Sequence, residues 1–234
     1  MIIGSILSKA GRQAVDWLFP PRCAVCGSAE SFLCLNCREL LPRAERPRCA
    51  VCWQPGGSSV CPKCERSRPA FDGLRSPYVF EAGARELVHG LKYQHQSVLA
   101  EPMADLLYRY LLDDPLPADV LVPVPLFFRR ERIRGYNQST LLARALARHL
   151  GLPPDDRTLV RARNTASQAR TSNVDERRVN VRDAFRCRDR QLVGKRVLLI
   201  DDVSTTGATL DSCARALLDG GATSVWGLTF AHED

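Results

Sequence analysis

The chain has 234 residues, of which 45% are hydrophobic and 25% are charged, a composition typical of a globular protein. It contains no run of 18 apolar residues, so no membrane-spanning helix is expected. The net charge is +7, and residues 121–190 alone contain 16 arginines, no lysine and 7 acidic residues.

The first segment, Met1–Pro20, is mildly amphipathic and predicts a short helical lead. It lacks the basic start and the small-residue cleavage site of a secretory signal peptide. We therefore expect a helix that docks on the rest of a cytoplasmic protein. Peripheral contact with the inner membrane is the alternative.

Eight of the ten cysteines form four C-x-x-C pairs within 42 residues. These pairs are Cys23/Cys26, Cys34/Cys37, Cys49/Cys52 and Cys61/Cys64. A C-x-x-C turn presents two thiolates at the spacing that a tetrahedral Zn²⁺ accepts, and two such turns complete a Cys₄ shell. The sequence therefore predicts two structural zinc ions in residues 21–68, with no open coordination position for chemistry.

Other uses of these cysteines fit the pattern less well. Nothing marks the chain as secreted, which disfavours disulfides, and an iron–sulfur cluster is a further alternative. We expect sequential pairing, in which the first two C-x-x-C pairs share one ion and the last two share the other. A cross-braced arrangement is the alternative. Each half is too short for a core of its own, so the metal is expected to supply its folding free energy.

The remainder, residues 69–234, alternates predicted strands and helices, which is typical of an α/β sheet. Residues 68–73 are expected to form a linker and turn, and residues 177–185 to be irregular or helical. Strands are expected over residues 77–80, 119–124 and 158–161, and helices over residues 84–93, 98–112 and 140–150. The 1–20 lead, the 21–68 zinc segment and this α/β unit make up the expected domain organisation.

The most informative segment runs from Val197 to Thr209. Val197–Ile200 is a continuous apolar run, as expected for a strand buried on both faces of a parallel sheet. Asp201 and Asp202 follow, and after them comes a turn rich in hydroxyl groups. A helix over residues 208–219 and a strand over residues 224–230 complete a βαβ unit, whose ligand is expected at the carboxyl end of the first strand.

The turn predicts a phosphate site. Backbone N–H groups at a helix N-terminus bind anions, and a glycine lets the backbone approach a ligand closely. Carboxylates just before the turn could accept hydrogen bonds from vicinal hydroxyls or lie near a Mg²⁺. A phosphorylated sugar satisfies both halves, whereas a P-loop is excluded because no lysine follows the glycine. An acidic strand end followed by an ordinary helix cap is the alternative.

This stretch closely resembles the 5-phosphoribosyl 1-pyrophosphate (PRPP) signature of type I phosphoribosyltransferases. The resemblance implies that Asp201 and Asp202 contact the ribose hydroxyls. It also implies that the turn holds the 5′-phosphate through Thr205, Thr206, Gly207, Ala208 and Thr209. Ser204 departs from the family pattern, which usually has an apolar residue there.

Further phrases narrow the resemblance to one branch. They are Leu91-Lys92-Tyr93, Val122-Pro123-Val124-Pro125, Arg134-Gly135-Tyr136-Asn137-Gln138 and the segment from Arg161 to Gln168. With the double zinc ribbon in front, the chain resembles the ComF family of competence proteins over nearly its full length. The resemblance implies a type I phosphoribosyltransferase-like fold with PRPP and Mg²⁺ as ligands. Candidate residues for the pyrophosphate and the mobile loop are Arg132, Arg134, Arg163 and Gln168.

Two functions follow from the resemblance. One is a protein that binds PRPP with Mg²⁺ and acts in DNA uptake and natural transformation; as an enzyme it would displace pyrophosphate from PRPP toward an acceptor that the sequence does not identify. The other is a non-catalytic, zinc-dependent adaptor that kept the fold. It would contact single-stranded DNA, or partner proteins such as a DNA-uptake helicase and a recombination mediator, through the zinc ribbons and arginines. Both uses of the fold are compatible with PRPP acting as a regulatory ligand.

Overall fold

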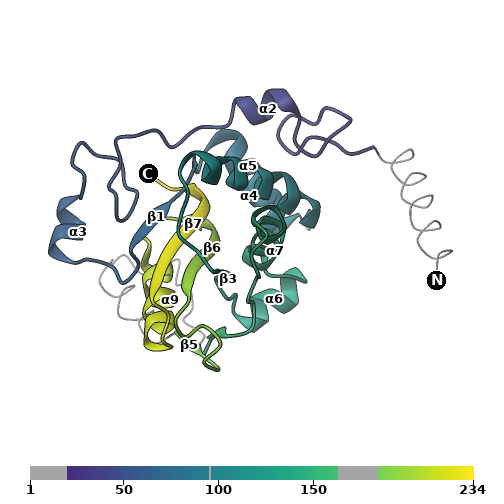
Figure 1. The fold of residues 1–234 in the computed structure, drawn as a ribbon. Coiled ribbons are helices and arrows are strands. Elements are labelled where there is room, and N and C mark those ends of the chain that lie inside the picture. Colours follow the sequence, from purple (N-terminus) through teal and green to yellow (C-terminus); the bar gives the residue numbers. More distant parts are fainter. Residues whose placement is uncertain (1–19, 95, 163–183) are drawn as a thin grey trace, which may run out of the picture.

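A computed structural model describes residues 20–94, 96–162 and 184–234 of the chain (Figure 1). Its main sheet has the strand order β1-β7-β6-β3, and β2 also pairs with β7. Every pairing in this sheet is parallel. The strands are β1 (Gly73–Arg75), β2 (Tyr78–Val79), β3 (Val120–Pro123), β6 (Arg196–Ser204) and β7 (Ser224–His232). The expected α/β class with a parallel sheet is confirmed.

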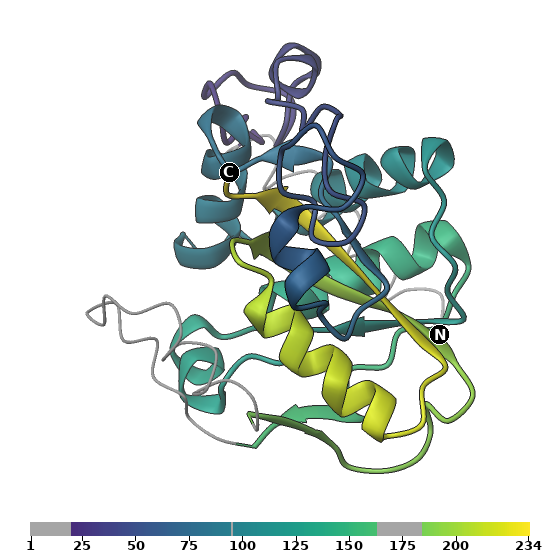
Figure 2. The ribbon, with the colours of Figure 1, turned by 90° about the vertical axis from the view of Figure 1, so that its left-hand side faces the viewer.

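Helices cover both faces of this sheet. On one side lie α4 (Ala82–Tyr93), α5 (Ala100–Asp113) and α7 (Gln138–Leu150), and α9 (Ala208–Asp219) lies on the other (Figures 1 and 2). The short elements are α2 (Leu35–Glu39), α3 (Pro62–Arg66), the 3₁₀ turn η1 (Ser97–Leu99) and α6 (Phe128–Arg134). An antiparallel pair, β4 (Leu159–Arg161) and β5 (Phe185–Cys187), lies beside α9. No helix in the described part of the chain is long and apolar enough to cross a bilayer.

The sheet divides the apolar core in two, because successive residues of a strand point to opposite faces. Leu198 and Ile200 of β6 pack with buried leucines of α4, α5 and α7. Val197 and Leu199 pack on the opposite face with leucines of α9. The apolar run is continuous because both faces of β6 are buried.

The two cysteine-containing halves repeat one local structure. In each half, the backbone N–H of the third cysteine points at the sulfur of the first: Cys34 N lies 3.5 Å from Cys23 Sγ, and Cys61 N lies 3.3 Å from Cys49 Sγ. Each second cysteine is followed by a residue with positive φ, Gly27 at 77° and Trp53 at 65°. In the second half this residue is Trp53, whose bulky side chain is only 2% exposed.

Several elements differ from the sequence-based expectations. Gly73, expected to end a linker, begins β1 and pairs with Trp226 of β7. Phe185, expected in an irregular or helical segment, lies in β5. The 98–112 helix begins as η1 and continues as α5. α6 has no buried residue, so it lacks the apolar periodicity from which helices are predicted. The 1–20 lead lies outside the described residues apart from Pro20.

Candidate functional site

The acid pair lies in the carboxyl half of β6. β3 ends at Pro123, which pairs with Ile200, so β6 continues past its neighbour from Asp201 onward. On its other side β6 stays paired with β7, where Asp201 is opposite Thr229. The two carboxylates therefore lie where one side of the strand is no longer covered by the sheet, at the carboxyl end expected for a ligand.

α7 orients Asp201. The hydroxyl of Ser139 donates to Asp201 Oδ1 at 2.7 Å, and the backbone N–H of Asp202 donates to the same oxygen at 2.9 Å. Ser139 is fixed in turn by the helix cap, because its N–H donates to Asn137 Oδ1 at 3.1 Å. The amide of Asn137 also donates to the carbonyl of Val124, which ties the start of α7 to the end of β3 at 3.0 Å.

α4 neutralises Asp202. Lys92, in the last turn of α4, places Nζ 2.9 Å from Asp202 Oδ1. The position of this helix end is fixed by Tyr136, whose hydroxyl donates to the carbonyl of Leu91 at 2.7 Å. The second oxygen of Asp202, Oδ2, is buried and has no hydrogen-bond partner among the described residues. A buried polar atom of this kind calls for a partner beyond the described residues.

The acid pair is electrostatically strained. Burial raises the pKa of Asp201 to about 7, and the neighbouring Asp202 carboxylate adds to the increase. The Ser139 hydrogen bond and the Lys92 ammonium oppose it in part. A hydroxyl donor or a cation that binds here would relieve the repulsion between the two carboxylates.

The turn after β6 has the features of an anion site. Thr205 and Thr206 are exposed, Gly207 is buried with φ of 73°, and α9 begins at Ala208. The first turn of a helix leaves backbone N–H groups without intrahelical partners. Thr205, Thr206 and the exposed Thr209 supply three hydroxyls in and just after this turn, and the hydroxyl of Thr206 accepts from the backbone N–H of Ala208 at 3.4 Å. The helix dipole favours a negative charge at this end.

The arginines named from sequence have different surroundings. Arg132 is exposed on α6. Arg134 donates to Gln138 and lies over the ring of Tyr93, 5.3 Å from its centroid. Arg163 and Gln168 lie outside the described residues.

Two basic residues that act on the acid pair were named from the sequence only as parts of longer phrases, without a contact to the acids. Lys92 pairs with Asp202. Arg161, which opens the last of the quoted phrases, lies close enough to Asp201 for their charges to interact. Burial and the charge of Arg130 lower the pKa of Arg161. Only the folded chain brings these residues to β6.

The eight paired cysteines form two clusters in chain order. The sulfurs of Cys23, Cys26, Cys34 and Cys37 lie within 4.8 Å of one another, and so do those of Cys49, Cys52, Cys61 and Cys64. Tetrahedral zinc with four thiolates separates the sulfurs by about 3.8 Å. The Sγ–Sγ distance is 3.7 Å between Cys26 and Cys34 and 3.6 Å between Cys52 and Cys61. The clusters fit two structural zinc ions in sequential pairing.

Thiolate stabilisation differs within the second cluster. Burial acts to raise the pKa of Cys49, but hydrogen bonds from the backbone N–H groups of Cys52 and Cys61 outweigh it and lower this pKa to about 6. Burial raises the pKa of Cys52 to about 11. Four thiols at this separation do not all ionise unless a cation compensates them, which is the role of the metal.

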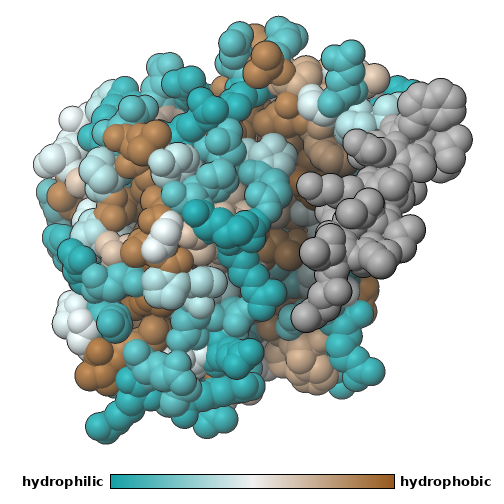
Figure 3. Space-filling view, turned by 45° about the vertical axis from the view of Figure 1, so that its right-hand side comes forward, coloured by the Kyte–Doolittle hydropathy of each residue, from teal (hydrophilic) through white to brown (hydrophobic). Residues whose placement is uncertain are grey.

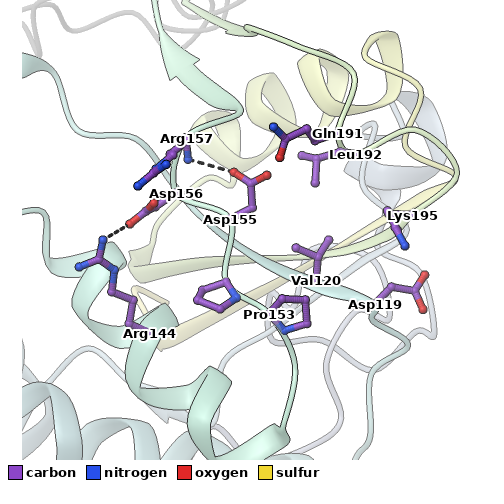
Figure 4. A pocket seen from close by; sticks show the side chains of 11 residues that line it. Asp119, Val120, Arg144, Pro153, Asp155, Asp156, Arg157, Gln191, Leu192 and Lys195 are labelled. Atoms are coloured by element: carbon purple, nitrogen blue, oxygen red, sulfur yellow. Dashed lines mark hydrogen bonds and ion pairs between the residues drawn. The ribbon is translucent and has the colours of Figure 1, made fainter.

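A separate pocket lies at the other end of the sheet (Figure 4). It is lined by residues at the amino ends of β3 and β6, among them Asp119 and Lys195. Three of its six charged residues are in ion pairs: Arg144 with Asp156, and Asp119 with Arg196 outside the lining. The acid pair and the Thr/Gly turn do not line it.

Comparison with known proteins supports this combination of parts. A model of the double zinc ribbon domain matches residues 14–66, and a model of the phosphoribosyl transferase domain matches residues 137–231. The DNA utilization protein YhgH of Salmonella typhi is 38% identical over 194 residues, covering 78% of this chain and 84% of that protein. Competence protein F of Haemophilus influenzae is 30% identical over 86% of this chain and 98% of its own length. Competence protein ComFC of Bacillus subtilis is 31% identical over 86% and 84%.

Proposed function

Because the chain belongs to the ComF family, with a double zinc ribbon before a phosphoribosyltransferase domain, we propose that it binds PRPP with Mg²⁺ and acts in DNA uptake. The observation that carries the proposal is the carboxyl end of β6, where an oriented acid pair precedes a hydroxyl-lined helix N-terminus. A phosphorylated ribose has vicinal hydroxyls at one end and a phosphomonoester at the other. The two halves of the site match these two ends.

The proposed roles follow from chemistry. Asp201 and Asp202 would accept hydrogen bonds from the ribose 2′- and 3′-hydroxyls. The turn would donate to the 5′-phosphate from its backbone N–H groups and hydroxyls. Its residues are Thr205, Thr206, Gly207, Ala208 and Thr209. Arg132 and Arg134 are the described candidates for the pyrophosphate, and their guanidinium groups suit bidentate contact with it.

Magnesium is part of the proposal because oxygen ligands are available. Mg²⁺ prefers carboxylates and the phosphates of a substrate, and it usually retains several waters. Asp202 Oδ2, which is buried and has no partner within the described ranges, and the half-buried Asp201 supply suitable oxygens. When bound, the ion would neutralise charge on the pyrophosphate.

Catalysis extends the binding proposal. Displacement of pyrophosphate from carbon 1 of the ribose develops positive charge on the sugar ring, and the acid pair is suited to stabilise that charge. The proposal leaves the acceptor open, because no residue of the chain identifies a particular base. Binding is therefore the property to test first.

The experiment is calorimetric titration of PRPP with Mg²⁺ into zinc-loaded protein, in parallel with the Asp201→Asn, Asp202→Asn double variant. We expect saturable binding by the unaltered protein and a loss of at least tenfold in affinity in the variant. Circular dichroism would establish that the variant is folded. Equal affinity of both proteins, or no binding by either, would contradict the proposed site.

A second candidate function, contact with single-stranded nucleic acid, is favoured by the surface of α6. This helix carries the exposed Arg129, Arg130 and Arg132, and no ion pair links them to other described residues. Phe128 and Ile133 on the same helix are 54% and 83% exposed. Cations beside apolar side chains suit a phosphate backbone with unstacked bases.

Figure 3 brings the side of the molecule with α6 and α7 forward and shows hydrophilic side chains mixed with apolar ones. The α6 helix includes neither the acid pair nor the Thr/Gly turn, but it carries the pyrophosphate candidates Arg132 and Arg134, so the two proposed ligands would share Arg132.

A further inference from the structure

The second cysteine cluster is linked to the turn after β6 through Gln54. This half-buried residue comes two positions after Cys52, and its side-chain amide donates to the carbonyl of Thr205 at 3.4 Å. The same nitrogen lies 3.5 Å from His232 Nε2 at the end of β7. Gln54 therefore bridges the cysteine cluster, the start of the turn and the sheet.

The chain just after this cluster supports the other end of the turn. The ring of Phe71, which is 2% exposed, approaches Gly207 so closely that a β-carbon there would lie 3.5 Å from it. The backbone N–H of Ala70 donates to Asp211 Oδ1, in the first turn of α9, at 2.6 Å. Phe71 also packs in the same apolar cluster as Cys49 and Cys64.

The metal ligands determine where Gln54 lies. Cys49 N donates to the carbonyl of Gln54 at 2.9 Å, and Trp53 N donates to the carbonyl of Cys49 at 3.0 Å. Trp53 has φ of 65°, an unfavourable conformation for a bulky residue that surrounding contacts must maintain. Its indole N–H donates to the carbonyl of Ser76 at 2.7 Å. If the four thiolates lost their ion, this strained loop would lose its main constraint.

The first cysteine cluster has different neighbours. Arg38, next to Cys37, pairs with Asp105 of α5 at 2.7 Å. Val25 lies against Gly83 at the start of α4. Within the described ranges, no hydrogen bond or ion pair joins residues 23–37 to residues 205–209. The two clusters therefore provide a comparison within one molecule.

We propose that the ion held by Cys49, Cys52, Cys61 and Cys64 keeps the Thr205–Thr209 turn in its phosphate-binding form, with Gln54 and Phe71 as the positioning residues. Zinc at this cluster and a phosphorylated ribose then bind with positive cooperativity, whereas zinc at the first cluster is independent of the ligand. The inference rests on the proposed function, because it requires that the turn binds a phosphate.

The first test compares equivalent ligands of the two clusters. Cys34 and Cys61 are both half-buried, and each occupies the N-cap position of a short helix, α2 and α3. Affinity for ribose 5-phosphate, which has the 5′-phosphate and needs no Mg²⁺, is measured by calorimetry for Cys34→Ser and Cys61→Ser. We expect Cys61→Ser to weaken binding by about 5- to 150-fold, the usual range of coupling between sites. Cys34→Ser is expected to bind as the unaltered protein does.

The second test leaves both metals in place, so it does not depend on the folding of a cysteine variant. Gln54→Ala removes the contact with Thr205, and Gln191→Ala removes the same side chain at the opposite end of the sheet. We expect Gln54→Ala to weaken ribose 5-phosphate binding by about two- to tenfold. Gln191→Ala is expected to leave the affinity unchanged, and both variants should retain two zinc ions.

Reciprocity supplies a measurement that a purely structural role would not affect. A chromophoric chelator competes with the protein for zinc. Saturating ribose 5-phosphate should raise the affinity of the protein for one of its two zinc ions, the one in the second cluster. The factor should equal that by which this ion strengthens ribose 5-phosphate binding. Equal effects of Cys34→Ser and Cys61→Ser, or no shift in the competition, would overturn the inference and leave the proposed function intact. No binding of ribose 5-phosphate or PRPP by the unaltered, zinc-loaded protein would overturn both.

Discussion

Lys92 Nζ lies 2.9 Å from Asp202 Oδ1, and this ion pair joins the end of α4 to the middle of the proposed site. The side chains are 19% and 4% exposed, so water compensates neither charge fully. A buried pair contributes little net stability compared with an apolar replacement, but removing one partner leaves an uncompensated charge. The contact therefore matters most for holding the Asp202 carboxylate in place.

Lys92→Met should consequently destabilise the protein, by about 3 kcal/mol in the free energy of unfolding. The cause is the buried carboxylate of Asp202, which loses its cation while its second oxygen still has no partner in the described part of the chain. Urea denaturation followed by circular dichroism measures the loss. In the Lys92→Met, Asp202→Asn double variant the charge is gone, so much of the stability should return. A double variant as unstable as the sum of the two single variants would contradict this account.

The pH dependence of stability should contain a contribution from Asp201. Its folded-state pKa is raised to about 7, whereas an aspartate in an unfolded chain titrates near 4. Between these values the folded state binds more protons than the unfolded state. Stability therefore falls as the pH rises from about 4 to about 7, by at most about 1.4 kcal/mol per pH unit.

Other groups titrate in the same range, His232 among them, because burial lowers the pKa of its imidazole. The informative quantity is therefore the difference in the free energy of unfolding between the unaltered protein and Asp201→Asn, measured at each pH. We expect this difference to change steadily between pH 4 and 7 and to be constant above about pH 8. A difference that does not vary with pH would show that Asp201 titrates normally.

Gly207→Ala should affect both stability and ligand binding. A methyl group there would meet Phe71 at an ordinary contact distance of 3.5 Å, so the cost comes from the positive φ of 73°. We expect a loss of about 1–2 kcal/mol in the free energy of unfolding. Gly151→Ala is the control, since Gly151 has φ of 66° with open space around it at the end of α7. Both variants should lose similar stability, but only Gly207→Ala should weaken binding of PRPP by calorimetry.

Metal analysis of the purified protein should give two zinc ions per chain, because the two cysteine clusters are separate. Cys26→Ser should retain one full site, since Cys26 belongs to the first cluster only. Cys187→Ser is the matched control: Cys187 lies outside both clusters and donates to the carbonyl of Ala216 in α9. Atomic absorption should therefore give one zinc ion per chain for Cys26→Ser and two for Cys187→Ser. Loss of zinc from Cys187→Ser would contradict the assignment.

Replacing Arg129, Arg130 and Arg132 of α6 with alanine should weaken binding to a single-stranded oligonucleotide. If each arginine contacts one phosphate, the slope of log affinity against log salt should decrease by about 2. A triple variant of Arg186, Arg188 and Arg190 removes the same charge from exposed positions on and after β5. Fluorescence anisotropy at several salt concentrations compares the two. Equal losses in both variants would indicate non-specific attraction by net charge and would remove α6 as the interface.

The parts of the fold that were predictable are those in which local patterns agree with tertiary packing. The α9 helix was expected over residues 208–219 and has the bounds Ala208–Asp219, because the Thr/Gly turn precedes it and Gly220-Gly221 ends it. The eight zinc ligands could be named because the C-x-x-C spacing is that of zinc sites, whereas their sequential grouping is shown by the positions of the sulfurs in the folded chain. β1 was missed because three residues with a leading glycine give no strand signal of their own. It forms because β7 offers an edge to pair with.

In the proposed site, too, some residues could be predicted from a local sequence pattern and others could not. Asp201 and Asp202 could be named from one contiguous string, whereas their partners Ser139 and Lys92 come from helices that are distant in sequence. The periodicity of α4 predicts that Lys92 lies near a helix end, but not which strand that end approaches. Only the packing of α4 against the sheet decides this.

The main-chain contacts of residues 42–51 with the edge strands have a practical consequence. Leu74 N of β1 donates to the carbonyl of Val51, and Val79 N of β2 donates to the carbonyl of Pro42, both at 2.8 Å. These bonds occupy donors that would otherwise lie along an open border of the sheet, where another chain could add a strand. A truncated protein that begins after the zinc ribbons would expose that border together with the apolar surface behind it. We therefore expect such a fragment to self-associate, so its failure to bind a ligand would not be informative about the intact chain.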